Sequence, residues 1–148
     1  TLAARSAERG AWFVADLKRL PVQNAAADVV LNVFSPADYG EFRRVLTPDG
    51  ELLKVVPGPD YLREVRSAVA VYLRGGAYDN ASVLAHLRAH AEVISETPVR
   101  SVAPLSPADS HDFLRMTPMT FSVPAEALEK IVLEKITIDV RVLRCRMR

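Results

Sequence analysis

The sequence is poor in the features that mark secreted, membrane-spanning or strongly basic chains. Its single cysteine, Cys145, cannot form an internal disulfide, which fits a reducing cytoplasm. The formal net charge is +1, so a polyanionic partner would have to be recognised by a local patch and not by the overall field. No run is long and apolar enough to span a bilayer, and no signal peptide precedes the first expected strand. We therefore expect a cytoplasmic chain that does not enter a membrane.

The composition is that of an ordinary soluble globular domain. Apolar residues make up 49% of the chain and charged residues 25%, and 148 residues leave room for one domain with one core. The sequence starts at Thr1 without a methionine. We expect it to be a fragment or a processed product of a longer protein.

The middle of the chain has the pattern of a strand, a helix and a second strand. Residues 28–34 (DVVLNVF) are almost all apolar and rich in β-branched side chains, which is typical of a strand buried on both faces. Ser35, Pro36 and Asp38 have the chemistry of a helix start, with Ser35 as the cap. Residues 51–56 (ELLKVV) form a second apolar run after a Pro-Asp-Gly turn. The pattern predicts a βαβ unit with a parallel pair of strands.

The flanking regions predict further helices and strands. Residues 136–142 alternate between apolar and polar side chains, which indicates an antiparallel strand near a sheet edge. Other strands are expected at 12–15, 93–95 and 99–103, and helices at 60–72, 80–91, 106–116 and 126–133.

Five segments resemble a known enzyme family. Residues 20–21 (LP), 28–30 (DVV) and 44–52 (RVLTPDGEL) resemble the second half of class I S-adenosylmethionine-dependent methyltransferases. Residues 31–36 (LNVFSP) and 114–120 (LRMTPMT) resemble, more narrowly, the 23S rRNA (guanine-N1)-methyltransferases, a family that includes enzymes associated with resistance to tylosin-type macrolides. The resemblance runs from about Ala15 to Met147.

The resemblance implies an α/β, Rossmann-like methyltransferase fold with a mostly parallel sheet and an antiparallel last strand. The chain would supply the third to seventh strands and would lack the first two, so residues 1–148 would be a partial catalytic domain. No Gly-x-Gly-x-Gly loop is present, because the only adjacent glycines, Gly75 and Gly76, follow an expected helix. The N-terminal zinc module of the narrower family is absent too, and we expect no metal site.

The implied function is transfer of a methyl group from S-adenosylmethionine to N1 of a guanine in 23S rRNA. Two alternatives stay open: a class I methyltransferase acting on a small molecule, and a non-enzymatic dimerisation or binding fragment. The missing first strand would leave residues 28–34 with an open apolar edge, which favours pairing with a second copy of the chain. We therefore expect a homodimer, and little activity from the 148 residues in isolation.

Four residues are implied to bind the cofactor: Asp16, Leu17, Leu20 and Asn32. Asp16 follows an expected strand, and in the family an acid at this place accepts a hydrogen bond from the adenine amino group. Leu17 would meet the ring through its backbone N–H, and Leu17 and Leu20 would add apolar wall. The plain alternative is that Asp16 is a solvated loop acid.

The end of the strand at 28–34 is the implied catalytic and substrate site. Asn32 is polar within an apolar strand, so it either contacts cofactor and base or bonds a neighbouring loop backbone. Phe34 either stacks on the target base or belongs to the core. Ser35 and Pro36 complete the implied substrate contact, with Asn32 and Phe34 as the catalytic pair.

The segment at 114–120 is implied to lie on the substrate side. Arg115 would bind a phosphate and Thr117 the base or the backbone, although Arg115 could equally neutralise a helix end. We expect both residues close to Asn32 and Phe34, at one end of the sheet. His86 and His90 are spaced for a metal, but without a third ligand they indicate a solvated helix face.

Overall fold

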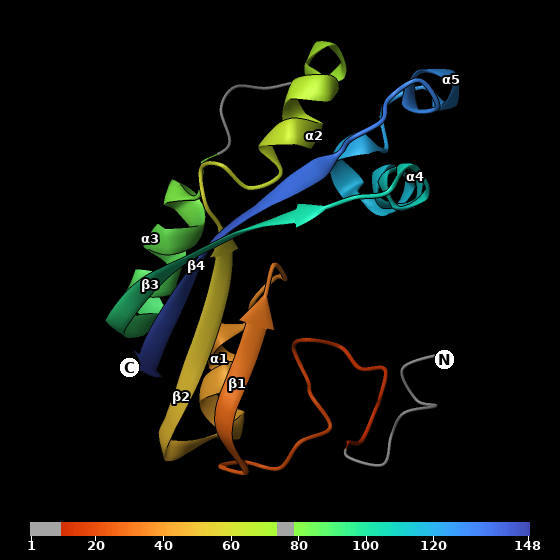
Figure 1. Ribbon diagram of the computed structural model, residues 1–148. Helices are drawn as coiled ribbons and strands as arrows, with labels where there is room; N and C mark the ends of the chain where they lie inside the picture. The colour runs from red at the N-terminus through yellow and green to blue at the C-terminus, as the bar shows by residue number, and fades with distance from the viewer. Residues whose placement is uncertain (1–9, 74–78) are drawn as a thin grey trace.

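The computed structural model describes residues 10–73 and 79–148. These residues form one four-stranded mixed sheet in the order β1-β2-β4-β3, with helices packed against it (Figure 1). The strands are β1 (Ala27–Val33), β2 (Leu46–Pro57), β3 (Ala91–Pro104) and β4 (Lys135–Met147). The helices are α1 (Tyr39–Val45), α2 (Arg63–Ala68), α3 (Ala81–His90), α4 (Pro107–Met116) and α5 (Ala125–Leu128), with 3-10 turns at Ala70–Tyr72 and Pro118–Thr120. None of the described helices is long and apolar enough to cross a membrane.

The sheet has the predicted α/β arrangement. β1 pairs with β2 in parallel through the crossover helix α1, and Asn32 lies opposite Lys54 in this pair. β4 is antiparallel to both β2 and β3, so β4 alone runs against the other three strands. The predicted antiparallel last strand, next to an edge of the sheet, is confirmed.

The predicted cap of α1 is wrong. Asp38, and not Ser35, is the N-cap, because its Oδ1 accepts a hydrogen bond from the backbone N–H of Glu41 at 2.8 Å. Ser35 instead accepts a hydrogen bond from Asn32 at its hydroxyl. Residues 34–37 are therefore a separate loop between β1 and α1.

The strand predicted at residues 12–15 does not form. Trp12, Phe13 and Val14 are exposed and have no strand partner among the described residues. A strand is stable only when a neighbour takes up its backbone hydrogen bonds, and β1 pairs with β2 alone.

Four other boundaries differ from the sequence pattern. β2 begins at Leu46, so the Pro-Asp-Gly segment expected as a turn lies within this strand. β3 continues through Pro98, which an edge strand tolerates because its outer side needs no backbone donor. The helix expected at 60–72 is divided into α2 and a 3-10 turn, and the helix expected at 126–133 ends at Leu128. Gly75 and Gly76 lie outside the described residues. Ser106 begins α4 as predicted, through a capping box with Asp109.

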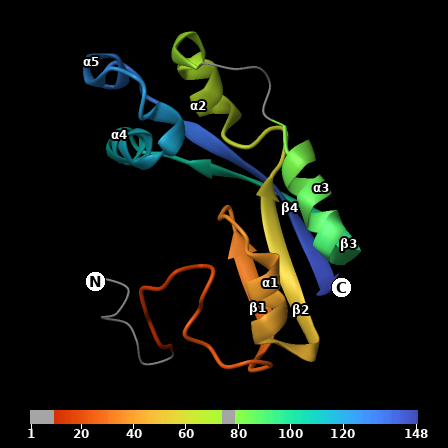
Figure 2. The same cartoon turned by 180° about the vertical axis from the view of Figure 1, so that it is seen from behind.

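Two apolar clusters hold the fold together. The first lies between one face of the sheet and helices α1 and α3, which share that face in Figure 2. Its buried members are Tyr39, Phe42, Leu52, Val56, Leu87, Ala91, Leu143 and Cys145. The second cluster joins α2 and α4 to the start of β4 through Leu62, Val65, Val69, Leu114, Val123, Leu133 and Ile136.

The opposite face of β1 is apolar and uncovered, which corrects the expectation of burial on both faces. Val29, Leu31 and Val33 point away from α1 and are 53%, 66% and 43% exposed. In Figure 1 the described helices α1 and α3 lie behind the sheet, and the front of β1 is open. The residues of β1 suit a strand buried on both sides, but the described elements cover only one.

Gly58 sits where only a hydrogen atom fits, so Gly58→Ala should destabilise the fold. A Cβ at this position would lie 2.5 Å from Oδ2 of Asp139, and that same oxygen accepts a 2.8 Å hydrogen bond from the backbone of Asp60. The strain should lower the free energy of unfolding by about 1–3 kcal/mol. Denaturant unfolding of Gly58→Ala and of Gly10→Ala, whose Cβ meets nothing within 4 Å, provides the measurement and its control. Equal stability of the two variants would contradict the predicted clash.

Glu64 joins α2 to β4 and should make the protein sensitive to acid. Its carboxylate accepts hydrogen bonds from the hydroxyl (2.6 Å) and the backbone N–H (2.8 Å) of Thr137. Burial raises the pKa of Glu64, but these hydrogen bonds outweigh it and lower the pKa to about 2. The carboxylate therefore stabilises the fold fully above its ordinary pKa of 4.5, and this contribution is lost as the pH falls towards 2.

We expect Glu64→Gln to flatten the decline in the free energy of unfolding between pH 4.5 and 2, relative to the unmodified chain. Glu126→Gln, at an exposed position of α5, is the matched control and should leave the decline unchanged. The same slope in the Glu64 variant and the unmodified chain would show that Glu64 does not link folding to protons in this range.

Candidate functional site

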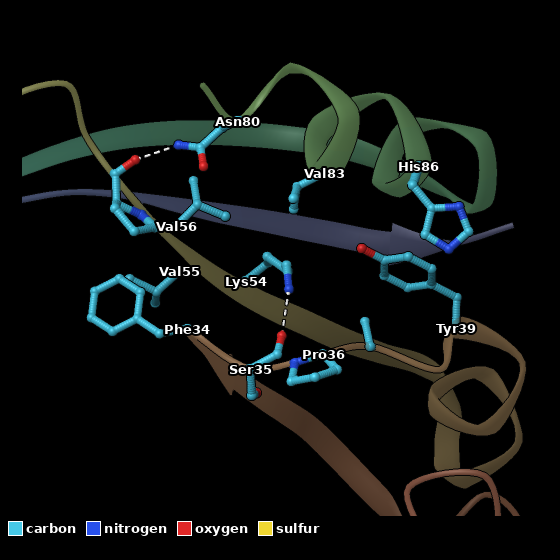
Figure 3. A pocket seen from close by; sticks show the side chains of 12 residues that line it. Phe34, Ser35, Pro36, Tyr39, Lys54, Val55, Val56, Asn80, Val83 and His86 are labelled. Carbon is cyan, nitrogen blue, oxygen red and sulfur yellow. Dashed lines mark hydrogen bonds between the residues drawn. The ribbon is translucent and has the colours of Figure 1, made fainter. Parts of the chain in front are cut away.

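A cleft of about 430 Å³ opens at the carboxyl ends of β1 and β2 (Figure 3). The loop after β1, the end of β2 and the first turns of α3 form its walls. Its lining residues are Phe34, Ser35, Pro36, Ala37, Tyr39, Lys54, Val55, Val56, Pro57, Asn80, Val83 and His86. The carboxyl ends of parallel strands are where open α/β sheets place their ligands, so this cleft is the candidate site.

Asn32 holds the loop that forms one wall of the cleft. Its side chain is buried, and its Nδ2 donates hydrogen bonds to Ser35 Oγ at 2.8 Å and to the Pro36 carbonyl at 2.9 Å. Its Oδ1 accepts a hydrogen bond from the ammonium of Lys54. Asn32 does not line the cleft itself, so in this structure its contacts position Ser35 and Pro36.

Phe34 is held in a rare backbone conformation at the mouth of the cleft. Its φ is 51°, in the left-handed region that non-glycine residues seldom adopt, and strain of this kind gathers at functional sites. Its N–H donates to the Val55 carbonyl at 3.2 Å, and its ring packs on Tyr61 with centroids 5.0 Å apart. The ring is still 47% exposed, so a flat ligand can reach it.

Lys54 is a site residue that the sequence pattern did not single out. Its side chain lies at the floor of the cleft, 4% exposed, with Nζ 3.2 Å from the Ser35 carbonyl. Burial lowers the pKa of this lysine. The signal was present in the sequence, because Lys54 is the one charged side chain inside the apolar run 52–56.

An aromatic cluster closes the far end of the cleft. Tyr39 packs against His86 and His90 from α3, with ring centroids 5.1 and 5.2 Å away, and the two histidines are 4.7 Å apart. Both histidines are also exposed, as predicted for a solvated helix face. Among residues 10–73 and 79–148, no group of three potential ligand side chains is arranged to hold a metal.

Three of the four predicted cofactor residues, Asp16, Leu17 and Leu20, lie on one loop that is tied to α1, whereas Asn32 lies in β1. Asp16 is exposed, and its Oδ1 accepts a hydrogen bond from the Lys18 backbone at 2.9 Å. Leu17 packs against the apolar cluster under α1. The backbone N–H of Leu20 donates to Oε1 of Glu41 at 2.7 Å. None of the three lines the cleft described above.

A partly buried ion pair on α1 fixes this loop. Arg44 donates to Glu41 from Nε at 2.8 Å, and also donates to the carbonyls of Leu20 and Val22 and to Asn24. The Arg44 guanidinium lowers the pKa of Glu41 to about 2, against the opposing effect of burial. Residues 20–24 are therefore held against α1 by the side chains of Arg44 and Glu41.

Arg115 and Thr117 lie at the same end of the sheet as Phe34, at the end of helix α4. Neither residue lines the cleft described above. Thr117 is buried, and its hydroxyl donates to the Phe113 carbonyl at 2.7 Å, so it ends α4. Arg115 is exposed, and its nearest carboxylate is that of Glu129 at 3.9 Å. The residue of α4 that lies near Phe34 is Phe113. These two side chains line a second, apolar cleft of about 300 Å³.

Comparison with known proteins gives relatives along almost the whole chain, although no family model matches it. The Bacillus subtilis protein YxjB, provisionally named a 23S rRNA (guanine-N(1)-)-methyltransferase, is 37% identical over 135 residues, or 89% of this chain and 48% of that protein. The 23S rRNA (guanine(748)-N(1))-methyltransferase of Streptomyces fradiae is 30% identical over 97% of this chain and 53% of its own length. A provisionally named relative from Micromonospora griseorubida is 32% identical, covering 99% and 50%.

The fold agrees with this relationship. A crystal structure from Bacillus halodurans, provisionally described as a methyltransferase, superposes with a TM-score of 0.51 over 98% of this chain and 74% of that one, at 14% identity. The chain spans about half the length of the curated relatives that it matches. Over nearly all of its length, the chain is therefore homologous to part of the 23S rRNA (guanine-N1)-methyltransferases.

Proposed function

We propose that the chain is part of an S-adenosylmethionine-dependent enzyme that methylates N1 of a guanine in 23S rRNA, in the cytoplasm. The observation that carries this proposal is the 30–37% identity to 23S rRNA (guanine-N1)-methyltransferases over 89–99% of the chain. A cleft at the carboxyl ends of two parallel strands, with an exposed aromatic ring at its mouth, supports it.

The loop at residues 16–20 is the proposed contact for the adenine end of the cofactor. Asp16 is solvent-exposed, so its carboxylate is accessible to an amino group, and Leu17 and Leu20 supply apolar surface beside it. The bound cofactor would supply an electrophilic methyl group. The sequence holds no glycine-rich loop for the methionine end, so we expect the 148 residues alone to bind the cofactor weakly.

The loop at residues 34–36 is the proposed contact for the target base. A guanine must leave its stack or pair before N1 can be reached, and an exposed aromatic ring stabilises an extruded base by roughly 1–3 kcal/mol. Phe34 has such a ring, and Asn32 fixes Ser35 and Pro36 next to it. Arg115, exposed on α4 at the same end of the sheet, is available to a phosphate.

A second candidate function is self-association without catalysis. The specific observation in its favour is the exposed apolar face of Val29, Leu31 and Val33 on an edge strand. A homodimer formed through this face is compatible with the enzyme as well as with a purely binding role.

The test uses the whole protein and unmodified 23S rRNA with labelled S-adenosylmethionine. Methyl on N1 blocks the pairing edge of guanine, so reverse transcription should stop at one guanine only after incubation with the protein. Labelled rRNA without a new stop, or no label at all, would reject guanine N1 as the acceptor.

Asp16→Ala should weaken cofactor binding measured by calorimetry by about 1–3 kcal/mol, the usual effect of leaving a polar partner unpaired. Asp49→Ala, which removes an exposed acid elsewhere on the chain, is the control.

A further inference from the structure

The cleft has a buried positive charge without a negative partner. Lys54 is only 4% exposed, and no carboxylate among the described residues forms an ion pair with it. Removing an ammonium from water is unfavourable unless hydrogen bonds or an opposite charge compensate for it. A cation at the floor of a cleft that has hydrogen bonds but no opposite charge among the described residues is therefore a candidate for binding a ligand.

The hydrogen bonds of Lys54 leave room for one more acceptor. Its ammonium has three hydrogens, and the described residues take up two of them, through Asn32 Oδ1 and the Ser35 carbonyl. Figure 3 shows the ammonium beside the loop that follows β1, within the cleft. A ligand oxygen that enters the cleft can accept the third hydrogen.

The walls of the cleft favour a flat ring over a small ion. Phe34, Val55, Val56 and Val83 line the same cleft as Lys54 and make much of its wall apolar. The volume of about 430 Å³ lies within the range of small-ligand pockets. Among the bases, guanine presents the O6 and N7 acceptors that lysine commonly recognises, whereas adenine presents an amino donor at position 6. A buried donor between apolar walls therefore favours a base with an oxo group, such as guanine, over adenine.

We propose that Lys54 binds O6 of the target guanine and stabilises the negative charge that collects on this oxygen during methyl transfer. This proposal rests on the proposed function. In the step, the N1–CH₃ bond forms, the S–CH₃ bond breaks with its electron pair going to sulfur, and the N1 proton passes to water. Part of the charge released at N1 is delocalised onto O6, and Lys54 compensates it while keeping its own protons.

The experiment measures nucleotide binding by NMR titration of the labelled 148-residue chain. Guanosine and inosine 5′-monophosphates carry the 6-oxo group, whereas 2-aminopurine riboside and adenosine 5′-monophosphates lack it. All four carry the same phosphate, so differences among them report the base. We expect the first two to shift signals of Lys54 and of residues 34–37, and to bind about tenfold tighter than the other two.

Lys54→Met should abolish this preference, while Lys130→Met, which removes an exposed charge outside the cleft and outside the proposed cofactor loop, should leave it unchanged. Guanosine and 2-aminopurine share the 2-amino group and differ in the 6-oxo group, so this ligand pair tests the contact without any mutation, and a poorly folded Lys54 variant does not obscure the result. Equal binding of that pair, binding outside the cleft, no binding of any nucleotide, or a preference that survives in Lys54→Met would each overturn the proposal.

The two proposals fail in different ways. Methylation of a 23S rRNA guanine without any 6-oxo preference in the cleft would reject the Lys54 contact and leave the proposed function standing. A 6-oxo preference that depends on Lys54, in a protein that methylates no rRNA, would support the contact and reject the proposed function.

Discussion

Leu31→Glu should convert the 148-residue chain from an associating species into a monomer. Leu31 is the most exposed of the three apolar side chains on the open face of β1, at 66%. β1 is also an edge strand, and an apolar edge recruits a further strand or a second face. A buried glutamate at the centre of such a contact would have to lose its hydration without a partner, so the contact should not form.

Light scattering over a range of concentrations provides the measurement. The control is Val132→Glu, which adds the same charge at a position of similar exposure, 62%, outside the sheet. We expect the unmodified chain and the Val132 variant to have masses of two or more chains, and the Leu31 variant to have the mass of one. A monomeric unmodified chain would show that the apolar face of β1 does not drive association.

The central βαβ unit could be predicted because local pattern and tertiary surroundings agree there. The apolar runs at 28–34 and 51–56 became β1 and β2, and the alternation at 136–142 became the antiparallel strand β4. Residues 12–15 have strand-like composition, but composition cannot supply the partner whose hydrogen bonds a strand needs. The same limit applies to β1, whose second apolar face no described element covers.

The positions of the site residues could be predicted from the sequence better than the roles of their side chains. The loop after the first buried strand does form a wall of the cleft, and Phe34 lies at its mouth. The use of Ser35 as an acceptor for Asn32, in place of a helix cap, depends on a three-dimensional loop that spacing along the sequence does not encode. The sequence pattern does not single out Lys54, because a lysine within a strand is usually directed to solvent, whereas this one is buried in a cleft that residues of α1 and α3 also line.

Asn32→Leu should be the most destabilising single change in the site, because it leaves the Lys54 ammonium buried with the Ser35 carbonyl as its one remaining acceptor. Removing the acceptor of a buried hydrogen bond from a charged group costs about 1.5–3 kcal/mol. The control Asn24→Leu, which removes an exposed amide bonded to Arg44, should cost less than about 1 kcal/mol in the same denaturant unfolding experiment.

A double-mutant cycle then measures the interaction energy between Asn32 and Lys54 apart from their other contacts. Replacing both partners, as Asn32→Leu with Lys54→Met, removes the buried charge together with its acceptor, so much of the lost stability should return. The coupling between the two changes should exceed about 1 kcal/mol, as it does for residues within one hydrogen-bond network. If the two losses simply add, the ammonium of Lys54 does not depend on Asn32. The loop at residues 34–37 would then be held by Ser35 and Pro36 through the Asn32 amide alone.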